Sequence, residues 1–354
     1  MPKQAYPGVV AYESAIQNPS RFFLDSELQQ AKFAQKPGGG TKLITGNYAI
    51  VYKAELPSGT YALRVFHKQP LPEMKDRYEA ISSYLSRFSA PYFVEYRYLD
   101  NEVLAQGERR PVILMKWVNG ISLDEYMNQY HQDKGAMLYL AGRFFGVVAG
   151  LIGLKMSHCD WQGGNAIFDS TTGEIILVDY DDTFAPIVPL VGSKSNGLGK
   201  EDYQHPKRKK AFFCEKTDNF SQLLIYFSFA LLSKKPELYG KFNNGDNIIF
   251  TKQDFLDPGN TPAWKEARIL NDKLVDGLMD ILVDACKKGP DELSQIPNLV
   301  DVINDIGEAL PPGKRPTIQA QPTTTVIPPT ATPTTARPQA PTTTTPTARP
   351  TAVL

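Results

Sequence analysis

The sequence predicts an α+β protein with a β-rich region, a helical region and a tail, and three observations support this prediction. Short apolar segments typical of strands occupy residues 40–118. Longer apolar segments at helical spacing occupy residues 119–310. From residue 311 onward proline, threonine and alanine dominate, and such a segment cannot bury a core. We therefore expect a packing extension over residues 1–39, followed by these two regions and a disordered tail over residues 311–354.

Composition narrows the class of protein. The 354 residues include 38 basic and 38 acidic side chains, so no basic excess indicates nucleic-acid or membrane-surface binding. Three scattered cysteines, without a C-x-x-C pair, suggest neither a zinc site nor a disulfide framework, and a reducing cytoplasm fits best. The longest apolar runs, residues 144–154 and 223–232, are shorter than the roughly 20 residues of a membrane span. No apolar segment follows the first charged residues, so we expect no signal peptide and a cytoplasmic location.

The β-rich region begins with apolar stretches separated by a turn at Pro57–Gly59. A helical pattern follows, with apolar side chains at Tyr78, Ile81 and Leu85. We expect strands over residues 42–54, 61–66, 91–96 and 112–115, and helices over residues 11–17 and 75–85. In the helical region, we expect a helical start at 123–127 and helices over residues 136–156, from 217, 270–287 and 299–310.

The segment 157–165 contains the pattern H-x-D-x-x-x-x-N, formed by His158, Asp160 and Asn165. A short hairpin follows, and Asp179 comes directly after the apolar strand 175–178. A buried histidine, a surface aspartate and a hairpin would explain each residue separately. Together, the order and spacing resemble the catalytic loop and metal-binding aspartate of protein kinases.

The resemblance is to the eukaryotic-like serine/threonine protein kinase family, in a divergent form, and covers about residues 43–310. It implies a bilobal fold, with a small β-rich N-lobe (40–118), a larger helical C-lobe (119–310) and ATP between them. Asp160 would orient or deprotonate a substrate hydroxyl, because phosphoryl transfer needs a carboxylate beside the attacking oxygen. Asn165 and Asp179 would supply oxygen ligands to the Mg²⁺ on the nucleotide.

The same resemblance implies nucleotide-binding residues in the β-rich region. Gly46 is the middle position of the glycine-rich loop, and isoleucine and alanine replace the other two glycines. Arg64 replaces the phosphate-binding lysine, with Glu79 as its expected partner and Glu73 in reserve. Met115 resembles the gatekeeper of a hinge in which backbone groups of Lys116 and Val118 would bind adenine. The full set of implied ATP-binding residues is Gly46, Ala49, Val51, Ala62, Arg64, Glu79, Met115, Lys116, Val118 and Asp179.

Several positions depart from the family pattern. Cys159 replaces the arginine of H-R-D, Gln162 replaces the catalytic-loop lysine, and Asp181 replaces the glycine of D-F-G. Lys207 ends a degenerate A-P-E segment, so we expect its usual ion pair to be absent. Asp218 matches the aspartate that caps the following helix and binds the backbone of the catalytic loop. We expect His158 to be structural and to bond backbone.

The resemblance favours an ATP- and magnesium-dependent phosphotransferase acting on a protein hydroxyl. Two other classes remain open: a nucleotide-binding pseudokinase or scaffold, and a small-molecule phosphotransferase of the aminoglycoside or choline kinase type. The segment Asp179–Asp181 suits the small-molecule enzymes, whereas Asp218 and His205–Pro206 favour a protein substrate. The Pro-rich tail is a spacer or a ligand of a proline-binding partner.

Overall fold

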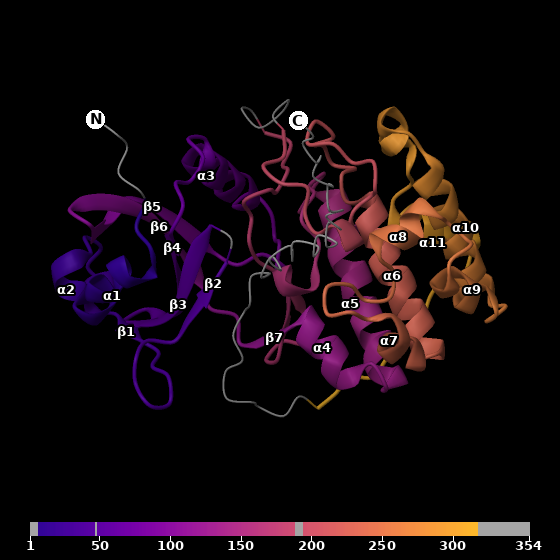
Figure 1. Cartoon of the computed structure of the whole chain (residues 1–354), viewed down its shortest axis with the longest axis horizontal. Coiled ribbons are helices and arrows are strands. Elements are labelled where there is room, and N and C mark those ends of the chain that lie inside the picture. Colours follow the sequence, from indigo (N-terminus) through magenta and orange to yellow (C-terminus); the bar gives the residue numbers. More distant parts are fainter. Residues whose placement is uncertain (1–5, 47, 188–193, 318–354) are drawn as a thin grey trace, which may run out of the picture.

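The computed structural model describes residues 6–46, 48–187 and 194–317. Figure 1 shows an antiparallel sheet region formed by the first third of the chain and a helical region formed by the rest. The predicted mixed α+β class is confirmed. Most of the predicted tail lies outside the described residues, but its first residues pack against the helical region. There the Lys314 N–H donates to the Gly135 carbonyl (3.1 Å), so the ordered packing extends beyond Leu310.

The main sheet has the strand order β1-β3-β4-β6-β5, with β2 also paired to β3. Its strands are β1 (Lys32–Phe33), β2 (Leu43–Thr45), β3 (Ala49–Leu56), β4 (Gly59–Phe66), β5 (Tyr96–Ala105) and β6 (Glu108–Lys116). The prediction of a strand over residues 91–96 is wrong, because β5 begins at Tyr96. Gln106 and Gly107 both have positive φ (53° and 79°) and form the tight turn that joins β5 to β6. Helix α3 (Met74–Leu85) packs against β5.

The N-terminal extension packs on this sheet, as expected. It contains α1 (Val9–Gln17), α2 (Pro19–Phe22) and the 3₁₀ helix η1 (Leu28–Gln30). Its apolar side chains Tyr12, Phe23 and Leu28 join a core cluster with side chains of the sheet. The Tyr12 hydroxyl also donates to the Phe66 carbonyl (2.6 Å), which joins the extension to the end of β4.

The helical region is built around α5 (Lys134–Gly153) and α6 (Asn219–Lys234), which lie side by side in Figure 1. The other helices are α4 (Leu123–Tyr130), α7 (Glu237–Phe242), α8 (Lys252–Leu256), α9 (Pro262–Arg268), α10 (Lys273–Lys287) and α11 (Leu299–Ile306). Gly307, with φ of 68°, ends α11 earlier than predicted. By length and composition α5 could cross a membrane, but half of its apolar window is buried in this core.

A small sheet lies between these two parts of the chain and carries the segments that matter for the site. It pairs β7 (Gly120–Ser122), β8 (Ala166–Asp169) and β9 (Ile175–Leu177). The loop before β8 contains Asp160 and Asn165, and the chain leaves β9 toward Asp179. Pairing of β8 with β9 therefore brings the two predicted functional segments together.

Candidate active site

A cleft between the main sheet and the small sheet encloses about 620 Å³ of empty space, part of it open to solvent. Its lining comes from β3, β4, β6 and the segments around β8 and β9. The lining residues are Val51, Ala62, Arg64, Val94, Met115, Lys116, Trp117, Val118, Gly164, Asn165, Val178 and Asp179. Eight of these were predicted as nucleotide or metal ligands, and Val94, Trp117, Gly164 and Val178 were not. One end of the cleft is therefore apolar, and the other carries Arg64 and Asp179.

The segment after β6 leaves one backbone donor free at the apolar end of the cleft. The Lys116 N–H donates to the Glu95 carbonyl (2.9 Å), so only the Lys116 carbonyl remains for a ligand. The Val118 N–H has no hydrogen-bond partner among the described residues. This part of the expected hinge therefore has a donor that a heterocycle such as adenine can use.

Gly46 follows β2, and its backbone groups are hydrogen-bonded within the protein. The Gly46 N–H donates to the Ala49 carbonyl (2.8 Å), and the Gly46 carbonyl lies 2.8 Å from His67 Nε2. Ala49 is buried in the core. Neither Gly46 nor Ala49 is among the residues that line the cleft, and the Gly46 N–H is already engaged and is not available to a phosphate. That these two residues contact nucleotide stays a prediction.

The buried carboxylate of Asp218 holds the 157–165 loop through three hydrogen bonds. Asp218 accepts hydrogen bonds from the N–H groups of His158 (2.5 Å) and Cys159 (2.9 Å) and from the Trp161 indole (3.0 Å). The predicted anchoring role is confirmed. The predicted helix cap is wrong, because the side chain makes no cap hydrogen bond to α6 and both oxygens are used by the loop. His158 Nε2 lies 2.9 Å from the Val178 carbonyl, so His158 has the predicted structural part.

The two carboxylate oxygens of Asp160 differ, because one accepts hydrogen bonds and the other has no hydrogen-bond partner. Its Oδ2 accepts from the side-chain amides of Gln162 (2.9 Å) and Asn165 (3.0 Å). Its Oδ1 is buried without a hydrogen-bond partner, next to Gly199. Burial and the nearby charge of Asp182 raise the pKa of Asp160 to about 6. A carboxylate with this pKa accepts a proton near neutral pH more readily than an ordinary aspartate.

Asn165 and Asp179 fit a magnesium site. The Asn165 amide nitrogen donates to Asp160, which leaves Asn165 Oδ1 buried and without a partner. The Val178 N–H donates to the Asn165 carbonyl (2.9 Å), so Asp179 follows directly beside Asn165. A carboxylate and an amide oxygen are ligands that Mg²⁺ accepts, with phosphate oxygens and water completing the shell. Among the described residues no cluster of three or more acidic, histidine or cysteine side chains forms an all-protein metal site.

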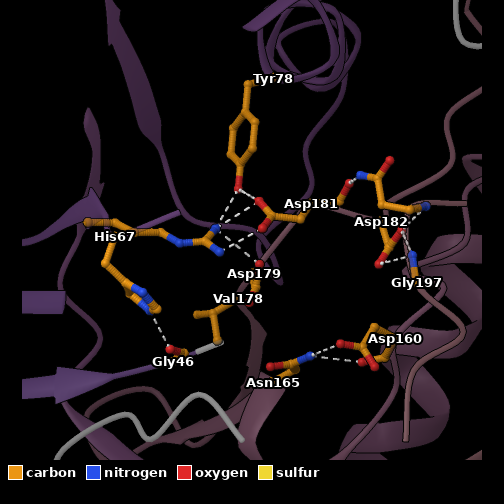
Figure 2. A network of polar contacts seen from close by, with 12 residues as sticks. Gly46, His67, Tyr78, Asp160, Asn165, Val178, Asp179, Asp181, Asp182 and Gly197 are labelled. Atoms are coloured by element: carbon orange, nitrogen blue, oxygen red, sulfur yellow. Dashed lines mark hydrogen bonds and ion pairs between the residues drawn. The ribbon is translucent and has the colours of Figure 1, made fainter. Parts of the chain in front are cut away.

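Arg64 is the centre of a polar network. Figure 2 shows three of its partners, Tyr78, Asp179 and Asp181. Its Nη1 lies 3.1 Å from Asp179 Oδ1, and it forms a two-pronged pair with Asp181 through Nη1 (2.8 Å) and Nη2 (2.6 Å). The Tyr78 hydroxyl joins the network and donates to Asp181 Oδ1 (2.6 Å). Although burial disfavours the charge, Asp179 and Asp181 hold the pKa of Arg64 above its ordinary value. Burial also raises the pKa of Asp179, against the opposing charge of Arg64.

The predicted Arg64–Glu79 pair is wrong. Glu79 is exposed, and so is the reserve candidate Glu73. The apolar spacing of α3 turns Tyr78 inward, so its neighbour Glu79 lies about 100° away around the helix and faces solvent. The same spacing is the signal that would have identified Tyr78.

Hydrogen bonds to Asp182 hold part of the segment after Asp181, and Gly199 in this segment lies next to Asp160. Asp182 accepts hydrogen bonds from the Ser195 hydroxyl (2.9 Å) and the backbone N–H groups of Asn196 and Gly197 (2.6 and 3.0 Å). Further along, Lys207 donates to the carbonyls of Lys287 and Lys288 at the end of α10 (3.0 Å each). Lys207 therefore replaces an ion pair with a contact that helix C-termini favour.

Neither a scan against models of known protein families nor a search of curated proteins finds a match to this chain. The cleft combines an apolar end, a free backbone donor, an arginine and the oxygen-bearing side chains of Asn165 and Asp179, and Asn165 is hydrogen-bonded to Asp160.

Proposed function

We propose that the chain is an ATP-dependent phosphotransferase with the bilobal architecture of protein kinases, and that it transfers the ATP γ-phosphate to a protein hydroxyl. The observation that carries this proposal is the arrangement of Asp160, Asn165 and Asp179. The side-chain amide nitrogen of Asn165 donates to Asp160, and its side-chain oxygen is buried without a partner, while Asn165 and Asp179 line the same cleft. A carboxylate for the acceptor hydroxyl and oxygen ligands for magnesium are the two requirements of this chemistry.

Each residue has a defined part in the proposed reaction. Adenine would lie at the apolar end near Met115 and accept from the Val118 N–H. Asn165 and Asp179 would hold Mg²⁺, which neutralises charge on the phosphates when bound. The substrate oxygen forms a bond to the γ-phosphorus, the bond to the β,γ-bridging oxygen breaks, and ADP leaves. The hydroxyl proton passes to Asp160, whose raised pKa suits it as an acceptor.

The test is phosphate transfer from labelled ATP to a positional peptide library, with wild type and Asp160→Asn. We expect magnesium-dependent transfer that Asp160→Asn lowers by roughly 100-fold or more, with ATP affinity kept. Asp169→Asn, at the end of β8 and outside the cleft lining, is the matched control and should retain transfer. Equal transfer by wild type and Asp160→Asn contradicts the assigned base. Transfer to aminoglycoside or choline acceptors, and not to peptides, would move the substrate to the small-molecule class.

A second candidate, nucleotide binding without transfer, is favoured by the buried Oδ1 of Asp160. Gly199 lies so close that a Cβ built on it would be 2.8 Å from this oxygen. An acceptor hydroxyl therefore needs the segment around Gly199 to move before it reaches Asp160. ATP binding in the absence of transfer to every acceptor tested would identify this function.

A further inference from the structure

The side chain of Arg64 is held by groups from two different parts of the chain, α3 and the segment after β9. Tyr78 comes from α3, and Asp181 comes from the segment after β9. We propose that Tyr78 and Asp181 are positioning residues for Arg64, and that they direct its unused hydrogens toward the phosphates of the nucleotide. This inference rests on the proposed function and adds how the phosphate-binding cation is oriented.

The contacts of Arg64 leave two hydrogens for a ligand. Nη1 carries two hydrogens and faces three acceptors, Tyr78 Oη, Asp179 Oδ1 and Asp181 Oδ1, at 2.8–3.1 Å. Nη2 uses one hydrogen on Asp181 Oδ2 (2.6 Å). The second Nη2 hydrogen and the Nε hydrogen have no acceptor among the described residues, and Arg64 lines the cleft. A planar guanidinium with one edge fixed presents its remaining donors in a defined direction.

Tyr78 is itself held in one orientation. Its side chain is fully buried, and its ring meets the Tyr96 ring edge-on with centroids 5.1 Å apart. The Tyr96 hydroxyl donates to the Tyr78 carbonyl (2.8 Å), which fixes the backbone as well. Burial and the adjacent carboxylate of Asp181 raise the pKa of Tyr78, so its hydroxyl stays protonated and donates to Asp181. A locked donor on α3 therefore orients the carboxylate that holds Arg64.

Two carboxylates near one guanidinium exceed what a simple structural ion pair needs. Asp179 is one of the proposed magnesium ligands, so magnesium competes with Arg64 for it. Asp181 forms the two-pronged pair and keeps Arg64 in place when Asp179 turns to the metal. The separate roles of the two aspartates explain why an aspartate suits position 181, where protein kinases have the glycine of D-F-G.

The experiment measures the affinities of wild type, Tyr78→Phe and Asp181→Asn for ATP with magnesium and for adenosine. We expect Tyr78→Phe to weaken ATP binding roughly three- to tenfold and Asp181→Asn roughly 10- to 100-fold. Adenosine affinity should be unchanged, because adenosine lacks the phosphates that Arg64 would contact. Glu79→Gln, the neighbouring exposed position on α3, is the control and should bind both ligands as wild type does. In an Arg64→Gln background, Asp181→Asn should have no further effect on ATP, since both act through one side chain.

The outcomes separate this inference from the proposed function. ATP affinities equal to wild type in both variants, or equal losses for ATP and adenosine, overturn the positioning role and leave the nucleotide site standing. A wild type that binds neither ligand overturns both proposals. Unliganded melting of each variant identifies a folding defect, and if Asp181→Asn does not fold, the milder Tyr78→Phe decides.

Discussion

Replacing Asp218 with alanine tests how the 157–165 loop is held in place. The carboxylate is 1% exposed and accepts three hydrogen bonds, from the N–H groups of His158 and Cys159 and from the Trp161 indole. Alanine leaves these three donors in the protein interior without an acceptor. Each such donor costs about 1–3 kcal/mol of folding free energy.

The expected loss is smaller than the full sum of the three costs. Burial raises the pKa of Asp218, which means that its charge is itself costly in the interior, and alanine removes that cost. We therefore expect Asp218→Ala to lower the free energy of unfolding by about 3–5 kcal/mol. Urea unfolding at pH 7, followed by tryptophan fluorescence, measures this difference.

Asp133→Ala is the matched control for this prediction. Like Asp218, Asp133 directly precedes a helix, in this case α5. Its carboxylate accepts a single capping hydrogen bond, from the Ala136 N–H (3.1 Å). Its loss should cost about 1 kcal/mol. If Asp218→Ala costs no more than Asp133→Ala, Asp218 does not anchor the loop and the reasoning is refuted.

Three further predictions follow from single side chains. Burial raises the pKa of Asp124 to about 6, so the folded state binds the proton of this carboxyl group more tightly than the unfolded state does. The stability that this proton contributes is complete below about pH 4 and is lost as the pH rises through about 6. Stability should fall by about 3 kcal/mol over this range, and Asp124→Asn should remove that part of the slope in urea titrations; an unchanged slope contradicts the assignment. Gly199→Ala should lower transfer by about tenfold or more and spare ATP binding, because its φ is 72° and its Cβ would meet Asp160 at 2.8 Å; wild-type initial rates would count against this. Gly146 is an exposed position in α5, and a Cβ built on it meets no atom within 4 Å. Gly146→Ala should therefore raise the free energy of unfolding by about 0.5–1 kcal/mol, and a loss of stability would contradict the free space around this position.

Local spacing predicted that one loop presents both Asp160 and Asn165. His158, Asp160 and Asn165 lie within eight residues, so the geometry of one loop sets their relative positions. The structure brings the amide of Asn165 onto Asp160 and the His158 ring onto the Val178 carbonyl. The anchoring role of Asp218 was predicted only through the resemblance, because it lies about 60 residues from the loop it holds.

The contacts of Gly46 and the start of strand β5 could not be read from local sequence. Taken alone, a glycine in an apolar hairpin fits an ordinary hairpin better than a phosphate loop. The contact between Gly46 and His67, 21 residues away, depends on the tertiary structure. Strand β5 was misplaced because a mixed polar segment pairs with β6, and pairing between strands is not visible in the residues of one strand.

The sequence by itself determined the α+β class, the order of the elements and the set of oxygen-bearing side chains in one loop. These depend on periodicity and spacing, which are local properties of the chain. Only the tertiary structure decided which acid pairs with Arg64, since Asp181 lies 117 residues away and Glu79 only 15. The resemblance to the regulatory helix of kinases favoured Glu79, but the apolar face of α3 turns Glu79 to solvent and brings Tyr78 inward. A buried guanidinium requires carboxylates that compensate its charge, and the meeting of β4 with the segment after β9 supplies two half-buried ones, Asp179 and Asp181.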